Sequence, residues 1–191
     1  MEKNIVVWPR IWLAAVFVAS TMLSISVARA EELGQILRGY EIAPVNLNLA
    51  GKDWILVGLG SYLVNTTGCN DCHTHPNWED KGNPYLGQPE QINTKEYLTG
   101  GRIFGPVTSP VAISANLTPD KPGKNGLPAG LTWDGFLQVM RTGHNPNDPP
   151  GVILQVMPWR LYRWKTDREL HAMYEYLRAI PSRPDNSNPG P

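Results

Sequence analysis

Apolar residues recur at helical spacing in three segments of this chain. The first segment, residues 53–66, carries apolar side chains on most of its surface and predicts a largely buried helix. Gly58 and Gly60 lower its helix propensity, and glycines in a packed helix usually permit a close crossing with another helix. This helix leads directly to Cys69.

The other two helical segments lie towards the C-terminus. One is predicted between an N-cap at Thr132 and a C-cap at Gly143, with its apolar stripe at Trp133, Phe136, Leu137 and Met140. The last is predicted over residues 167–179, because Thr166 and Glu169 form a capping box and Pro181 ends the pattern. We expect the first and last helices to touch.

The remaining mature sequence is irregular. Residues 74–130 are rich in Pro, Gly, Asn and Thr, and they predict long loops with short strands near 102–104 and 111–114. Residues 182–191 are rich in Pro, Ser and Asn and predict a disordered tail. The expected fold class is mainly α, with three or more helices and long irregular loops.

The N-terminus has the organisation of a secretory signal. Lys3 and Arg10 precede an apolar run over residues 11–27, and Ala28-Arg29-Ala30 supplies a small-x-small cleavage pattern. We therefore expect residues 1–30 to be a cleaved signal peptide and the mature chain to be periplasmic. A retained membrane anchor is the alternative, although the run is short for a membrane span and is broken by Ser and Thr.

Charge and length limit the possible functions and the number of domains. The chain has 17 basic and 17 acidic residues, and loss of residues 1–30 removes Lys3, Arg10, Arg29 and Glu2, leaving a net charge of −2. No basic run indicates nucleic-acid binding. The mature length suits one domain, which we divide into an N-terminal extension, 31–52, and a domain over 53–181.

The two cysteines of the chain occur in Cys69-Asn70-Asp71-Cys72-His73. Cys-x-x-Cys-His is the attachment signature of c-type haem. Two sulfurs on one helical turn can form thioethers to the haem, and the following His73 can ligate its iron as the proximal ligand. The alternatives are a redox dithiol, a Cys69–Cys72 disulfide, or zinc with His73 or His75, which lacks a second cysteine pair.

The mature chain has three methionines that could supply a distal ligand to a haem iron. Met140 and Met173 fall on the apolar helix stripes, where packing explains them. Met157 lies outside these stripes, immediately before Pro158, which stiffens the backbone. Met157 is therefore the expected distal iron ligand, with His144 as the alternative in a bis-histidine site.

The order of the motifs resembles a known family. After the helix containing Gly-Ser-Tyr and the Cys-x-x-Cys-His motif come Asn-Leu-Thr-Pro-Asp at 116–120, the Trp-containing helix, Met157-Pro158-Trp159 and a final helix ending before Pro181. Over about 53–181 the chain is similar to class I cytochrome c domains, particularly those of the cytochrome subunits of bacterial membrane-bound alcohol and aldehyde dehydrogenases.

This resemblance implies a cytochrome c-like fold around one haem c held by Cys69 and Cys72, with His73 proximal and Met157 distal. It also implies that Gly60 and Tyr62 lie near Tyr174. A proline carbonyl would orient His73, and the candidates are Pro76, Pro84, Pro106 and Pro110.

The expected function is one-electron transfer rather than catalysis. Electrons would come from a dehydrogenase and pass to a cytochrome or oxidase, and membrane contact would arise only by association or through a retained signal. Two other classes compete: a haem enzyme or gas-binding sensor with an open or bis-histidine site, and a haem-free exported protein with a Cys69–Cys72 disulfide.

Overall fold

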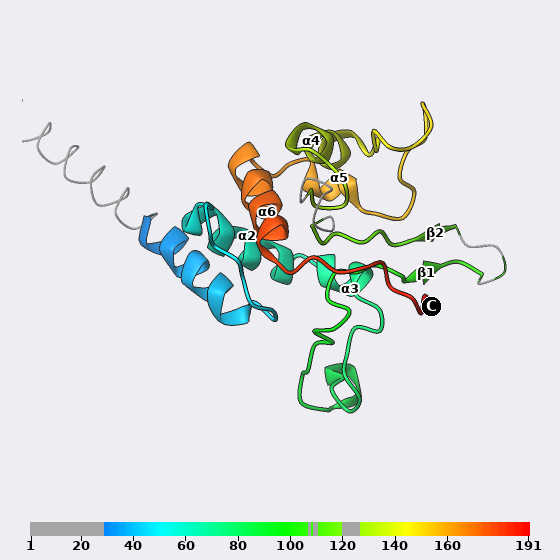
Figure 1. The fold of residues 1–191 in the computed structure, drawn as a ribbon, viewed down its shortest axis with the longest axis horizontal. Coiled ribbons are helices and arrows are strands. Elements are labelled where there is room, and N and C mark those ends of the chain that lie inside the picture. Colours follow the sequence, from blue (N-terminus) through cyan, green and yellow to red (C-terminus); the bar gives the residue numbers. More distant parts are fainter. Residues whose placement is uncertain (1–28, 107, 109–110, 120–126) are drawn as a thin grey trace, which may run out of the picture.

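The computed structural model describes residues 29–106, 108, 111–119 and 127–191, and this part of the chain is mainly helical (Figure 1). Residues 1–28 of the expected signal peptide lie outside the described residues. The other elements are two short antiparallel strands, β1 (Ile103–Phe104) and β2 (Ala112–Ile113), and a one-turn 3₁₀ helix, η1 (Pro84–Leu86). The strands confirm the sequence prediction.

The first predicted helix is α2 (Trp54–Thr66). The Asp53 carboxylate caps it by accepting from the backbone N–H of Ile55 at 2.8 Å. A short helix, α3 (Cys69–His73), follows at once. Between them Gly68 has φ 82°, a left-handed conformation that favours glycine, so the chain turns sharply before the two cysteines.

The two C-terminal helices also form where the sequence predicts them. They are α4 (Trp133–Thr142), capped by the Thr132 hydroxyl and ended by Gly143, and α6 (Asp167–Ala179), which begins with the Thr166–Glu169 capping box. A one-turn helix, α5 (Trp159–Tyr162), lies between them and was not predicted. It is too short to produce an apolar stripe.

Helices α2 and α6 cross at very close range (Figure 1). A Cβ atom added to Gly60 would lie 1.9 Å from the Ala172 carbonyl oxygen and 2.8 Å from the Tyr176 Cβ. The expected helix contact is confirmed, but Gly60 faces Tyr176 instead of Tyr174. Residues 172 and 176 share one face of α6, whereas the Tyr174 ring turns towards Phe136 of α4.

The N-terminal extension, 31–52, adds a helical segment that is described over residues 29–42. It crosses α2 on glycines, because a Cβ atom on Gly39 would lie 1.9 Å from the Gly58 carbonyl oxygen. The buried Ser61 hydroxyl donates to the Gly39 carbonyl at 2.6 Å. Helix α2 is thus covered on one side by this segment and on another by α6.

The C-terminal residues correct one prediction. Residues 182–191, expected to be a disordered tail, run beside β1 in Figure 1. The backbone N–H of Ile103 donates to the Gly190 carbonyl at 2.6 Å, and that of Gly190 donates to Gly101 at 3.0 Å. Main-chain hydrogen bonds hold this segment, and a composition-based prediction does not detect them.

Among the described ranges, no helix has both the length and the apolar character needed to cross a bilayer.

The α2–α6 crossing yields the first prediction. Gly60→Ala should lower the free energy of unfolding by about 2 kcal/mol or more, because the added methyl overlaps backbone atoms of α6. Gly34→Ala is the matched control, since Gly34 is helical and exposed with nothing within 4 Å of its added Cβ. It should leave stability unchanged or raise it slightly. Urea unfolding of both variants measures the difference, and equal midpoints would contradict the crossing.

Candidate functional site

An apolar cavity of about 220 Å³ lies between α3, α4, α5, α6 and β2. Its lining includes Cys69, Cys72 and His73 from α3, and Met157 from the segment before α5. The walls are largely aliphatic and aromatic, with contributions from Val64, Leu117, Leu131, Phe136, Leu154 and Leu177. The four residues singled out from the sequence therefore meet at one cavity, although Met157 lies far from the others along the chain.

His73 is oriented by a backbone carbonyl. Its Nδ1 lies 2.7 Å from the Ala115 oxygen, so Nδ1 carries the donated proton and Nε2 retains its lone pair. The acceptor is Ala115 and none of the four candidate prolines, which corrects that expectation. Burial lowers the pKa of His73, despite the opposing effect of this hydrogen bond, and favours the neutral imidazole that a metal requires.

The two thiols are not joined to each other, and their surroundings disfavour ionisation. Burial raises the pKa of Cys69 to about 11 and also raises that of Cys72. Reactive dithiols depend on a lowered pKa, so these surroundings are unlike those of a thiol–disulfide enzyme. Tyr162 lies beside Cys69 and is held inward, because its hydroxyl donates to the Thr67 carbonyl at 2.8 Å.

Three methionines, not one, reach the cavity. Met140 and Met173 line it together with Met157, although the sequence accounts for them by helix packing alone. Both are also 2% exposed core residues, on α4 and α6. Met157 is in irregular chain, where its carbonyl accepts from the Trp159 backbone N–H at 2.8 Å, and it is only half-buried.

The other three histidines lie elsewhere in the described structure. His144 Nδ1 hydrogen-bonds the Val152 carbonyl at 2.8 Å, and the residue does not line the cavity. His75 lines a separate polar hollow, with Trp78 and Arg102. His171 lies against the Trp133 ring, with 4.9 Å between ring centroids.

The donor set discriminates between possible cofactors. A closed zinc site needs four ligands, and over the described ranges no three His, Cys, Asp or Glu side chains are placed so that together they could hold a metal ion. Two thiols on one helical turn, an imidazole with a free Nε2 and a thioether in an apolar cavity fit the attachment and ligation chemistry of haem c. Family models, curated proteins and solved structures give no match to this chain.

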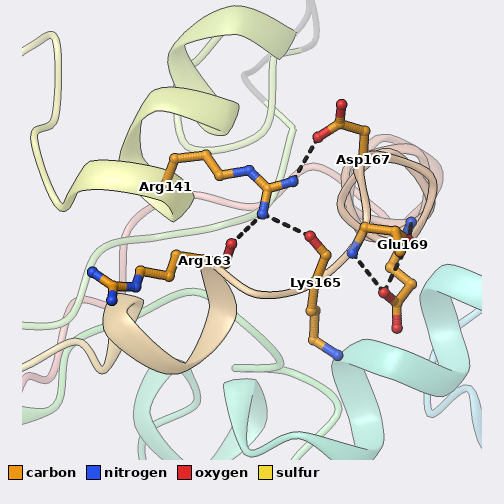
Figure 2. Close-up of polar contacts among 6 residues, drawn as sticks. Arg141, Arg163, Lys165, Asp167 and Glu169 are labelled. Atoms are coloured by element: carbon orange, nitrogen blue, oxygen red, sulfur yellow. Dashed lines mark hydrogen bonds and ion pairs between the residues drawn. The ribbon is translucent and has the colours of Figure 1, made fainter.

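The loop between α5 and α6 is held in place by Arg141 of α4 (Figure 2). The Arg141 guanidinium donates to the Arg163 carbonyl, to the Lys165 carbonyl at 2.6 Å and to the Asp167 carboxylate at 2.5 Å. The side chains of Arg163 and Lys165 extend away from it. We call this set of contacts the Arg141 network.

The capping box adjoins the same loop. The Thr166 backbone N–H donates to Glu169 Oε2 at 2.7 Å. Partial burial alone raises the pKa of Glu169, but the hydrogen bonds from Thr166 outweigh it and the pKa is lowered. Glu169 therefore keeps its negative charge at the start of α6. The Arg141 network and the capping box together hold the α5–α6 loop in place.

Removal of the Arg141 network provides the second prediction. Arg141→Met keeps much of the aliphatic stem but leaves two carbonyls without their charged donor, so it should cost on the order of 2 kcal/mol in unfolding free energy. Asp167→Asn is the control, because it removes only an exposed charge and should cost less than about 1 kcal/mol. Urea unfolding compares them, and equal effects would assign the stabilisation to the ion pair.

Proposed function

We propose that this chain is an exported one-electron carrier with one covalently attached haem c. The observation that supports this most directly is the meeting of Cys69, Cys72, His73 and Met157 at a single apolar cavity. Cys-x-x-Cys-His alone is a sequence pattern. The thioether supplied from a distant loop adds a second, independent element of the same chemistry.

Each residue has a defined role in the proposal. The Cys69 and Cys72 thiols would hold the haem through two thioethers, each sulfur bonding to one vinyl carbon while its proton goes to the other. His73 would ligate the iron through Nε2, because Ala115 holds the opposite ring nitrogen. Met157 presents its sulfur from a segment stiffened by Pro158.

The bound haem supplies a one-electron iron couple. The surrounding residues set its potential through ligand identity and burial. Met157 favours a higher potential than a second histidine would. The aliphatic walls, with Leu131, Leu154 and Leu177, exclude water and disfavour additional charge on the cofactor.

A cytochrome c-like fold is part of the proposal, and the helix arrangement supports it. The helix before the motif crosses the last helix, and α4 and α5 enclose the same cavity. The signal pattern supports a periplasmic location. The resemblance to dehydrogenase cytochrome domains supports a dehydrogenase as electron donor and a cytochrome or oxidase as acceptor.

The competing functions receive less support from the geometry. A bis-histidine site would need His144, which bonds to Val152 away from the cavity. A thiol–disulfide function would need an acidic thiol, and burial acts in the opposite direction.

Covalent attachment gives the third prediction. The parent protein from the periplasm should retain haem after acid–acetone extraction and give a pyridine haemochrome spectrum. The Cys69→Ala/Cys72→Ala double variant should lose all extraction-resistant haem, because the chain has no other cysteine. Haem retained by the double variant would contradict thioether attachment. A parent without haem but with a Cys69–Cys72 disulfide would favour the haem-free alternative.

The fourth prediction concerns the distal ligand. Met157→Ala should keep the haem, because the thioethers are independent of this residue. It should lose the weak red Met–iron band, shift to a lower reduction potential and bind cyanide or imidazole more readily. Absorption spectra and redox titration measure these changes.

Met140→Leu is the control for this prediction, because it replaces another cavity-lining thioether with a side chain of similar volume. It should retain the red band. A Met157→Ala spectrum like that of the parent would remove Met157 from the iron. The same spectral loss in Met140→Leu or His144→Ala would identify the ligand instead.

A further inference from the structure

The turn beginning with α5 presents a basic and aromatic surface made of Arg160, Leu161, Arg163, Trp164 and Lys165, which we call the α5 patch. Leu161 is 72% exposed and Trp164 is 77% exposed. The Arg163 guanidinium carbon lies 4.7 Å from the centroid of the Trp164 ring. Two large apolar side chains therefore project into solvent beside cations.

The exposed side chains Leu161 and Trp164 lie on a turn that is fixed by hydrogen bonds. Tyr162 is buried and bonded to Thr67, and the Trp159 indole donates to the Leu154 carbonyl at 3.2 Å. These two residues are three apart and anchor the inner side. Leu161 and Trp164, also three apart, fall together on the outer side. The Arg141 network braces the same turn from α4.

The α5 patch carries only positive charge. Residues 158–165 contain three cations and no acidic residue. The next acids along the chain are engaged, since Asp167 pairs with Arg141 and Glu169 accepts hydrogen bonds from Thr166. By contrast, the chain without its signal has a formal net charge of −2. The patch is therefore complementary to a surface that is anionic and accepts apolar side chains.

We propose that the α5 patch attaches this protein reversibly to an anionic lipid surface, with Leu161 and Trp164 entering the interface. Tryptophan favours the boundary between headgroups and acyl chains, and lysine and arginine are attracted to anionic headgroups. Two apolar side chains and three cations suit surface binding rather than insertion.

A lipid surface fits better than a protein partner. The outward side chains offer hydrogen-bond donors but no acceptor, although protein interfaces usually contain many direct hydrogen bonds that fix the register of the partner. Leu161 and Trp164 also project from the turn, as an interfacial anchor requires. A fluid bilayer needs no register, so this composition is sufficient for it.

Binding to lipid does not depend on the proposed haem function. What such binding would do for electron transfer does rest on that function. The segment that ends in the α5 patch also supplies Met157 and Pro158 to the cavity wall. Attachment through the patch would hold that side of the cavity close to the membrane, where membrane-bound redox partners could exchange electrons with it.

Flotation with vesicles tests the proposal, using the protein purified from periplasm without detergent. The parent should bind vesicles of phosphatidylethanolamine and phosphatidylglycerol, bind phosphatidylcholine vesicles far less, and dissociate as salt is raised. Leu161→Ser/Trp164→Ser should bind the anionic vesicles roughly tenfold more weakly or worse. Arg160→Gln/Arg163→Gln should also lose roughly tenfold or more, because each cation contributes separately.

Tyr85→Ser/Leu86→Ser is the matched control. These residues of η1 are 83% and 72% exposed, but their loop carries Glu79, Asp80 and Glu90. The control should bind like the parent. Any retained signal is shared by all variants, so differences between them report on the patch. Unchanged far-ultraviolet dichroism in either α5 pair verifies its fold, and the two pairs are independent.

Three results would overturn the proposal: no preference for anionic vesicles, α5 variants that bind like the parent, or equal loss in the η1 control. A parent that ignores vesicles, combined with α5 variants that exchange electrons more slowly with an acidic redox protein, would assign the patch to protein docking instead. Haem content is measured on the same samples. Patch-dependent binding by a haem-free parent would refute the proposed function and leave lipid attachment standing.

Discussion

The close approach of α2 to α6 at Gly60 determines where the rest of the structure lies. With no side chain at this position, the α6 backbone comes within contact distance of α2. The end of α2 then directs Gly68 and the two cysteines to one wall of the cavity, while Met173 and Leu177 of α6 supply another. Behind the crossing, the Tyr97 hydroxyl donates to Asn65 at 2.6 Å and lies 2.9 Å from the Tyr176 hydroxyl. Because the members of this buried polar cluster hydrogen-bond to one another, these bonds offset the desolvation cost of burying them beside the crossing.

The polar groups of the cavity are few, and burial dictates their states. The Cys69 thiol is kept protonated, and the pKa of His73 is lowered so that its imidazole stays neutral. Neither group alone is unusual in a protein core. Here both line the same apolar cavity, and the Ala115 carbonyl engages the Nδ1 nitrogen of the His73 ring. An imidazole held at Nδ1 can offer its Nε2 lone pair to a metal, so this arrangement supports the proposed role of His73 as an iron ligand.

Local signals in the sequence predict the helices and their caps well, and they predict less of what lies between. Thr132, Gly143 and the Thr166–Glu169 pair mark ends that the structure confirms, because caps depend on residues only three or four positions apart. The Ala115 carbonyl could not be identified, since any backbone carbonyl can accept from His73 and sequence does not reveal which loop passes it. The sequence did not predict that residues 182–191 are ordered, for a similar reason. Their main-chain hydrogen bonds to Gly101 and Ile103 do not depend on amino-acid composition. For Met140 and Met173, the sequence predicted packing on apolar helix stripes, but it did not indicate that both also line the cavity.

The turn around α5 has two faces with different chemistry, and its rigidity decides how they are related. Tyr162 and Trp159 point inward from it, and the Arg141 network binds its carbonyls from behind. Coupling between an outer surface and an inner site requires an element with two arrangements of similar free energy. A turn with this many internal hydrogen bonds favours one arrangement. Contact at Leu161 and Trp164 would therefore orient the molecule and leave Met157 in place, so the α5 patch acts as an anchor rather than a switch.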